Sequence, residues 1–247
     1  MVDSDTNSRV VAITGAVTGI GRTTAELFAK RGARLILLDR NPVVVDVARE
    51  LGADHRGWTV NVADAASVNK AIDEAAKAFG RIDVLVNNAG IGPLAPAESL
   101  SDEIWDMTIA VNLRGPFLCA RAAGRHMIAR GYGRIINLAS QAAVIGIEGH
   151  TAYCASKAGI IGLTNCLALE WGPKGVTTNA ISPTVVDTEL GRSGWAGEKG
   201  DKARAEIPTR RFAQPIEIAE AIYFLASDNA AMINGANLMI DGGNTIR

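Results

Sequence analysis

Three side chains near the middle of the chain have the types and spacing that proton transfer to a substrate oxygen requires. Tyr153 and Lys157 lie four residues apart in segment 153–171, whose apolar residues recur at helical spacing. Positions i and i+4 share a helix face, so the tyrosine hydroxyl and the lysine ammonium are expected side by side. A nearby cation favours the phenolate, which would lower the pKa of Tyr153 toward the range of a useful general base.

Ser140 follows the apolar run 134–138, where a buried strand is predicted to end. Open α/β sheets bind ligands at the carboxyl ends of their strands, so Ser140 is expected in the same site. The alternative for Tyr153 and Lys157 is an amphipathic pair, with the tyrosine at the core edge and the lysine in solvent. The remaining motifs decide between these interpretations.

A glycine-rich turn, Thr14-Gly-Ala-Val-Thr-Gly-Ile-Gly21, lies between a predicted strand, 9–13, and a predicted helix, 23–31. Its glycines would permit a tight turn, close approach of a pyrophosphate and an open helix N-terminus. Asp39 ends the next predicted strand, near the spacing of a group that holds the adenosine ribose. A carboxylate there would favour NAD(H) and repel a 2′-phosphate, an effect that Arg40 would partly offset. An ordinary turn, and a helix N-cap at Asp39, are the alternatives.

Strands and helices alternate along the rest of the chain. This order predicts an α/β fold over residues 1–247, a single-domain Rossmann-like doubly wound parallel sheet with helices on both faces. The further strands are predicted at 57–60, 83–87, 134–138, 176–181 and 237–240, and the helices at 43–51, 65–79, 102–117, 121–130, 153–171 and 215–226. Segment 185–208 is rich in glycine and has no clean period. It is predicted to be an irregular substrate loop that closes over ligands, with Trp195 as its apolar contact.

The composition excludes several functional classes. A net charge of -1 without a basic tract gives no support for nucleic-acid binding. No run of about 18 apolar residues indicates a membrane span, and segment 1–8 lacks the pattern of a signal peptide. Three cysteines without CxxC spacing and three histidines without a metal motif predict neither a disulfide framework nor a metal site. We therefore expect a cytoplasmic protein.

With these motifs in place, the chain resembles the short-chain dehydrogenase/reductase family over nearly its whole length. The matching motifs are TGxxxGIG at Thr14 to Gly21, NNAG at Asn87 to Gly90, Asn112, Ser140, Tyr153-x-x-x-Lys157, the turn 183–188 and DGG at Asp241 to Gly243. Two positions depart from the family pattern. Asn61 stands where aspartate is usual, and Thr184 replaces a glycine, so the turn after Pro183 is expected to differ slightly because a β-branched residue resists positive φ.

The resemblance implies roles for individual residues. Tyr153 would be the general acid/base, Lys157 would tune it and hold the nicotinamide ribose, and Ser140 would bind the reacting oxygen. Asn112 would help to hold a water that relays protons to solvent. The implied contacts of the cofactor NAD(H) are Gly15, Thr18, Gly19, Ile20, Gly21, Asp39, Arg40, Asn61, Val62, Asn88, Ala89, Gly90, Tyr153, Lys157, Pro183, Val186 and Thr188.

Three functions remain as hypotheses. The first is an NAD-dependent oxidoreductase that interconverts a small secondary alcohol or polyol and its ketone, with Gln141, Glu148 and His150 facing a hydroxylated substrate. The second is a 3-oxoacyl thioester (acyl-carrier-protein) reductase. Such enzymes often use NADPH, which Asp39 disfavours, and need a basic surface for the carrier protein, which the near-neutral net charge does not indicate. The third is a non-catalytic nicotinamide sensor, which would not need Ser140, Tyr153 and Lys157 together.

The resemblance also implies a homotetramer. Segment 153–171 is apolar on more than one face, so one face is expected to meet the sheet and another to meet the same helix of a second subunit. The strand 237–240 is expected to supply a further contact.

Overall fold

A seven-stranded sheet lies at the centre of the computed structural model, which describes residues 8–247 apart from the side chains of residues 190 and 193. Every neighbouring pair of strands in it is parallel, as the alternating pattern predicts. The spatial order is β3 (Arg56–Thr59), β2 (Arg34–Asp39), β1 (Val10–Thr14), β4 (Val84–Asn87), β5 (Gly133–Leu138), β6 (Val176–Pro183) and β7 (Asn237–Ile240). The strand order reverses between β1 and β4, and parallel sheets form their ligand crevice at such a point.

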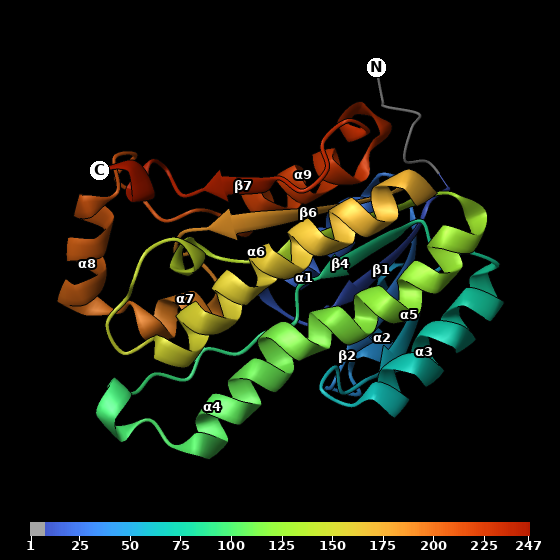
Figure 1. The fold of residues 1–247 in the computed structure, drawn as a ribbon. Helices are drawn as coiled ribbons and strands as arrows, with labels where there is room; N and C mark the ends of the chain where they lie inside the picture. The colour runs from blue at the N-terminus through green and yellow to red at the C-terminus, as the bar shows by residue number, and fades with distance from the viewer. Residues whose placement is uncertain (1–7) are drawn as a thin grey trace.

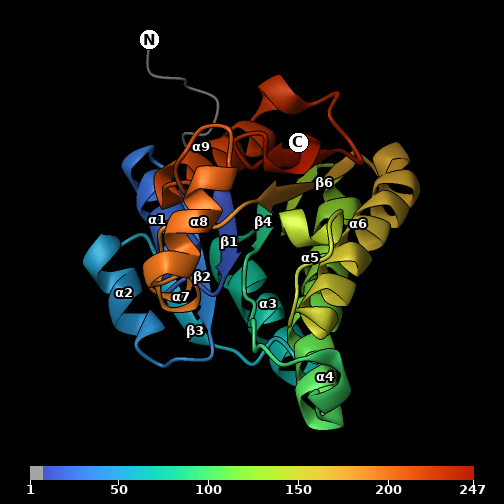
Figure 2. The ribbon, with the colours of Figure 1, turned by 90° about the vertical axis from the view of Figure 1, so that its left-hand side faces the viewer.

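Helices cover both faces of the sheet (Figures 1 and 2). Successive side chains of a strand point to opposite faces, and β1 shows the result. Val11 and Ile13 pack in one apolar cluster with α1 (Gly19–Lys30), α2 (Val44–Leu51) and α9 (Pro215–Ala226). Val10 and Ala12 pack in the other, with α3 (Ala65–Phe79), α5 (Gly115–Arg130) and α6 (Thr151–Trp171). The predicted fold class is therefore confirmed.

The helix before β5 is longer than the sequence pattern indicates. The predicted helices 102–117 and 121–130 are joined, because α4 (Asp102–Ile109) continues through a π-helical turn, Ala110–Arg114, into α5. Strand β6 also runs further than expected and includes Ser182 and Pro183. Proline lacks an N–H, but at the last position of a strand it removes at most one bond from the ladder.

The prediction that segment 185–208 is irregular is wrong. It contains two helices, α7 (Glu189–Gly194) and α8 (Gly197–Glu206), which lie beyond the arrowhead of β6 in Figure 1. Helix α7 begins at Thr188, whose Oγ1 accepts a hydrogen bond of 3.1 Å from the amide of Gly191. Helix α8 is charged around most of its circumference, so it lacks the apolar period by which a helix is recognised in a sequence.

One helix among residues 8–247 is long and apolar enough to cross a membrane by length and composition alone. This segment, Thr151–Lys174, has a mean hydropathy of 1.2 and extends α6 into the following turn. By this measure the segment is more apolar than the search for an uninterrupted apolar run indicates. Of its large apolar side chains, Ile160 and Leu167 are buried beside the sheet, whereas Leu169 is exposed.

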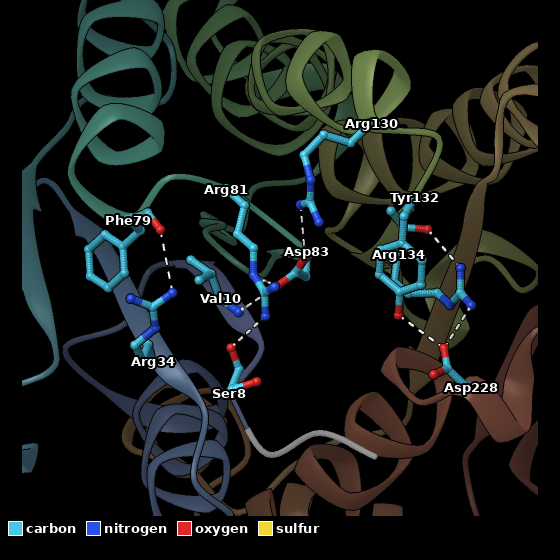
Figure 3. Close-up of polar contacts among 11 residues, drawn as sticks. Ser8, Val10, Arg34, Phe79, Arg81, Asp83, Arg130, Tyr132, Arg134 and Asp228 are labelled. Atoms are coloured by element: carbon cyan, nitrogen blue, oxygen red, sulfur yellow. Dashed lines mark hydrogen bonds and ion pairs between the residues drawn. The ribbon is translucent and has the colours of Figure 1, made fainter.

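A buried carboxylate joins three parts of the chain at the end of the sheet where β1 and β4 begin (Figure 3). The side chain of Asp83 is only 4% exposed. Its Oδ2 accepts from the amide of Val10 at 2.8 Å and pairs with Arg81 Nε at 2.8 Å, while its Oδ1 pairs with Arg130 Nη1 at 3.0 Å. A charge removed from water is tolerated only when it is paired and hydrogen-bonded in this way.

A second carboxylate lies nearby in the same view, at the end of α9. Asp228 pairs with Arg9 at 2.6 Å and with Arg134 at 3.1 Å, and it accepts a hydrogen bond of 3.0 Å from the Tyr132 hydroxyl. The arginines lower the pKa of Asp228 against the opposing effect of its partial burial. We call Asp83, Asp228 and their partners the basal ion-pair group; it ties β1, β4 and β5 together.

The first prediction tests the basal ion-pair group. Asp83→Asn should lower the free energy of unfolding by about 2 kcal/mol, because two arginines would lose their buried anion. The matched control is Asp46→Asn, whose carboxylate pairs with Arg49 on the surface, with side-chain exposures of 65% and 74%. The control should change stability by less than about 0.5 kcal/mol. Urea unfolding measures both variants, and equal midpoints would contradict the assignment.

Candidate active site

A cavity of about 860 Å³ lies at the carboxyl edge of the sheet, where β1 and β4 diverge. Its wall is built from the glycine-rich turn, the segments that follow the strands, and the start of α6. Most of the predicted site residues line it: Gly15, Thr18, Gly19, Ile20, Asp39, Arg40, Asn61, Val62, Asn88, Ala89, Gly90, Ser140, Tyr153, Lys157, Pro183, Val186 and Thr188. Gly21 and Asn112 are outside the lining and support residues within it.

The three residues from which the sequence argument begins meet in this cavity. Tyr153 and Lys157 lie in the first two turns of α6, and Ser140 comes directly after Ala139 at the end of β5. Lys157 is buried, with its Nζ donating a hydrogen bond of 2.5 Å to the carbonyl of Leu138. The same Nζ lies 5.6 Å from the centre of the Tyr153 ring. Ser140 Oγ accepts from the amide of Ala142 at 3.2 Å, which fixes the turn that carries it.

Burial governs the protonation of this pair. It raises the pKa of Tyr153 above the usual value for a phenol, and a hydrogen bond with Ser140 opposes part of the increase. Burial also lowers the pKa of Lys157 to about 8. The expected lowering of the Tyr153 pKa by the lysine is therefore not the dominant effect in the protein alone, because removal of the phenolate from water outweighs it.

Asn112 holds the segment after β4 in place. It lies within the π-helical turn, with an exposed fraction of 1%. Its Oδ1 accepts from the amide of Ile91 at 2.8 Å, and its Nδ2 donates to the carbonyl of the same residue at 2.8 Å and to Ser156 Oγ at 3.3 Å. The side-chain amide is thus occupied by these contacts. Its role in holding a proton-relay water stays a prediction.

The glycine-rich turn needs glycine for steric reasons. Gly15 has a φ of +65°, in the left-handed region that favours glycine. A Cβ at Gly21 would lie 2.0 Å from the carbonyl oxygen of Gly15, so the first turn of α1 has no space for a side chain. Such a turn leaves backbone amides at the helix N-terminus free for a phosphate.

Thr14 and Asn88 bind the turns that follow β1 and β4 to each other. Thr14 Oγ1 accepts from the amides of Asn88 and Ala89, each at 3.0 Å. Asn88 Nδ2 donates to the carbonyls of Thr14 and Gly15, also at 3.0 Å. Sequence reasoning missed the role of Thr14, although its place as first residue of the TGxxxGIG motif was the available signal.

Asp39 faces the glycine-rich turn across the end of β2. Its Oδ2 accepts from the amide of Val17 at 3.1 Å, and its Oδ1 accepts from that of Asn41 at 3.0 Å. Helix α2 begins after Val43, so Asp39 is not its N-cap. The closed turn, the carboxylate beside it and the exposed Arg40 fit the pyrophosphate and ribose of a dinucleotide.

The two departures from the family pattern have limited effects. Asn61 Oδ1 accepts from the amide of Ala63 at 3.1 Å, which closes the turn after β3. Thr184 does not adopt positive φ, since Ser8 and Arg210 are the non-glycine residues that do so among residues 8–247. Thr184 thus avoids positive φ, as expected for a β-branched residue, and the predicted difference of this turn from the family pattern stays a prediction. Its buried hydroxyl has no hydrogen-bond partner among the described residues, and the residue lines the cavity.

The predicted substrate residues divide into two sets. Gln141, His150 and Trp195 line the cavity. Glu148 does not: it is exposed, and its backbone carbonyl lies 2.7 Å from His150 Nδ1. The structure therefore brings His150 to the cavity and leaves the carboxylate of Glu148 in solvent.

Ser156 is a further residue that the sequence analysis missed. It is buried between Tyr153 and Lys157 on α6, and its Oγ donates to the carbonyl of Tyr153 at 2.7 Å. Because Asn112 donates to the same Oγ at 3.3 Å, the hydroxyl links the π-helical turn to α6. Its position directly before Lys157 was the only signal in the sequence.

Comparison with known proteins agrees with this geometry. A family model described as enoyl-(acyl carrier protein) reductase matches residues 15–245. D-threitol dehydrogenase of Mycolicibacterium smegmatis is 53% identical over 98% of this chain and 94% of its own length. The NAD-dependent glycerol dehydrogenase of Listeria innocua serovar 6a is 46% identical over 99% of this chain and 97% of its own length.

Solved structures share the same architecture. The 3-ketoacyl-(acyl-carrier-protein) reductase of Brucella melitensis, crystallised with NADH, has a TM-score of 0.91 at 34% identity and covers 97% of this chain and 99% of its own. The predicted site residues, the glycine-rich turn, the parallel sheet and these similarities agree along nearly the whole chain. The protein therefore belongs to the short-chain dehydrogenase/reductase family.

Proposed function

We propose that this protein is an NAD-dependent oxidoreductase that interconverts a small polyol, or another secondary alcohol, and the corresponding ketone. The observation that carries the proposal is the convergence of Tyr153, Ser140 and Lys157 on one cavity wall, opposite a dinucleotide-binding turn that faces Asp39. The similarity to the threitol and glycerol dehydrogenases supports the substrate class.

Nicotinamide supplies the hydride chemistry when NAD is bound, and the protein supplies orientation and proton transfer. The turn from Gly15 to Gly21 would hold the pyrophosphate, and Lys157 would reach the nicotinamide ribose. In alcohol oxidation Tyr153 accepts the hydroxyl proton as the carbon loses hydride, and in ketone reduction it returns that proton. Ser140 donates a hydrogen bond to the substrate oxygen, where charge develops during the reaction.

Lys157 has two properties that suit it to support Tyr153. Its hydrogen bond to Leu138 holds the amine beside the tyrosine, and burial brings its pKa to about 8. An ammonium group there stabilises the phenolate, and a pKa near neutrality lets the group lose and regain its proton during turnover.

A ketoacyl thioester reductase is the second candidate function. The description of the matching family model and the similarity to the Brucella reductase favour it. Against it stand the carboxylate of Asp39, which disfavours the 2′-phosphate of NADPH, and a net charge of -1, which offers little attraction for an acidic carrier protein.

We also propose a homotetramer in the cytoplasm. Exposed apolar side chains occur on α9 and β7 (Ile216, Phe224, Leu238) and on α4 and α5 (Trp105, Met107, Phe117), so two separate faces are available for self-association. On α6 only Leu169 is a large exposed hydrophobic residue, which gives the proposed helix contact less support.

Three free cysteines fit a reducing compartment. A monomer in light scattering, or secretion on cell fractionation, would contradict these assignments.

The second prediction tests the general acid/base. Tyr153→Phe should lower kcat by about 10²- to 10⁴-fold for polyol oxidation with NAD, because the transferable proton is lost while the ring remains. The control is Tyr132→Phe, which removes a hydroxyl bonded to Asp228 in the basal ion-pair group. Absorbance at 340 nm with polyols, aliphatic alcohols and ketoacyl thioesters gives the rates. Higher activity with the thioesters would favour the second candidate function.

The third prediction concerns pH. Because the pKa of Tyr153 is raised, the phenolate that oxidation requires is scarce near neutrality and becomes more abundant as the pH rises. The kcat/KM for alcohol oxidation should therefore rise from pH 6 to pH 9, approaching tenfold per unit, whereas ketone reduction should not rise over the same range. Initial rates in both directions measure the profile. Oxidation that falls with pH would rule out Tyr153 as the base.

The fourth prediction concerns the choice of cofactor. Wild-type protein should prefer NAD to NADP, and Asp39→Ser should reduce that preference in kcat/KM by about ten- to a hundred-fold, the range for hydrogen bonds to a charged group. Asp46→Ser, which changes an exposed aspartate on the neighbouring helix, is the control. Equal efficiency of the wild type with both cofactors would show that Arg40 offsets the carboxylate.

A further inference from the structure

The C-terminal segment reaches the substrate side of the cavity through a chain of three hydrogen-bonded contacts. Asn244 Nδ2 donates to Gln141 Oε1 at 2.8 Å. Arg247 Nε donates to Asn244 Oδ1 at 3.0 Å, and its Nη2 pairs with Glu206 Oε2, at the end of α8, at 3.0 Å. The contacts therefore run from the helix beyond β6, through the tail, to the residue that follows Ser140.

The tail that carries Asn244 is held in place by Asp241. Its Oδ1 accepts from the amide of Gly243 at 3.0 Å, and its Oδ2 accepts from the amide and hydroxyl of Thr245 at 2.8 and 2.7 Å. The tail also lies against the segment after α8, since a Cβ at Gly242 would lie 2.2 Å from Thr209 Oγ1. The folded backbone of the tail therefore holds the Asn244 side chain beside Gln141.

These contacts determine which end of the Gln141 amide faces the cavity. Arginine donates hydrogen bonds and cannot accept them, so Arg247 must meet the oxygen of Asn244. Asn244 must then direct its Nδ2 toward Gln141, whose oxygen accepts. Gln141 is 6% exposed and lines the cavity, and no group among residues 8–247 bonds to its Nε2. The amide therefore offers a hydrogen-bond donor to a ligand.

We propose that Asn244 is a positioning residue that sets the orientation of the Gln141 amide, so that Gln141 donates to a second oxygen of the substrate. The inference rests on the proposed alcohol dehydrogenase function and narrows its substrate class. The preferred alcohol carries an oxygen with a free lone pair beside the reacting carbinol, as in a vicinal diol, a hydroxyketone or an alkoxy alcohol. A plain secondary alcohol would displace water from this Nε2 without replacing its hydrogen bond, which costs binding free energy.

The test compares three alcohols that differ in this second oxygen: 2,3-butanediol, 3-methoxy-2-butanol and 2-butanol. The diol can donate or accept at that oxygen, whereas the ether can only accept. Wild-type kcat/KM should be about two- to tenfold higher with either oxygenated substrate than with 2-butanol, the effect of one hydrogen bond. The decisive quantity is the ether ratio, kcat/KM with 3-methoxy-2-butanol divided by kcat/KM with 2,3-butanediol.

Asn244→Asp should reverse the orientation of the amide. The new carboxylate can only accept, so Gln141 would turn its Nε2 to the tail and its Oε1 to the cavity. An oxygen there accepts from the diol but cannot donate to the ether. The ether ratio should fall about two- to tenfold, with diol activity within about twofold of wild type.

A second variant should reverse the orientation of the Gln141 amide by changing the surface ion pair at the end of the chain of contacts. Arg247→Glu combined with Glu206→Arg keeps an ion pair but places an acceptor beside Asn244, which then turns its own oxygen toward Gln141. The ether ratio should fall as in Asn244→Asp. The control is Thr245→Val, which removes a hydroxyl bond to Asp241 in the same tail without touching Gln141.

The possible outcomes distinguish failure of the Asn244 inference from failure of the proposed substrate class. An unchanged ether ratio in Asn244→Asp or in the charge-swapped variant overturns the inference alone, and so does an equal fall in Thr245→Val, which would show a general effect of the tail. A wild type that uses 2-butanol as well as the diol contradicts the polyol specificity and this inference with it.

Discussion

Lys157 brings an ammonium group into the protein interior, where a charge without partners is costly. The carbonyl of Leu138, at the end of β5, accepts its hydrogen bond and thereby holds α6 against β5. Tyr153 lies one helical turn earlier on the same helix, so its position follows from that contact. Ser140 lies two residues beyond Leu138 and is placed by the same strand. One hydrogen bond thus fixes how Tyr153 and Lys157 lie relative to the sheet.

Polar side chains hold the surrounding turns, where regular ladders of backbone hydrogen bonds end. Asn88 and Thr14 join the turns after β4 and β1, and Asn112 binds both backbone groups of Ile91. A turn of this kind leaves backbone donors and acceptors that need partners once they are buried. The side-chain amides of Asn88 and Asn112 satisfy them and at the same time fix the turns that form the cavity wall.

The sequence predicts features that depend on local pattern and predicts poorly those that depend on distant contacts. The apolar strand before Gly15 and helix α3 follow from patterns of neighbouring residues, and the structure has both. Helix α8 has no apolar period and was missed. The raised pKa of Tyr153 depends on burial, which spacing along a helix does not reveal. Gln141 and Asn244 are 103 residues apart, and no local motif connects them.

The two ends of the parallel strands carry different groups of residues. The basal ion-pair group lies where the strands begin, whereas the cavity, α7 and the tail lie where they end. Substitutions at sites that share no contacts change stability almost additively. Residues at the carboxyl ends of the strands can therefore be varied to change the substrate range, in evolution or in the laboratory. The ion pairs at the opposite ends of the strands keep the protein stable while this happens. Because the strands are parallel, residues that stabilise the fold and residues that line the cavity lie at opposite ends of the sheet and can change independently.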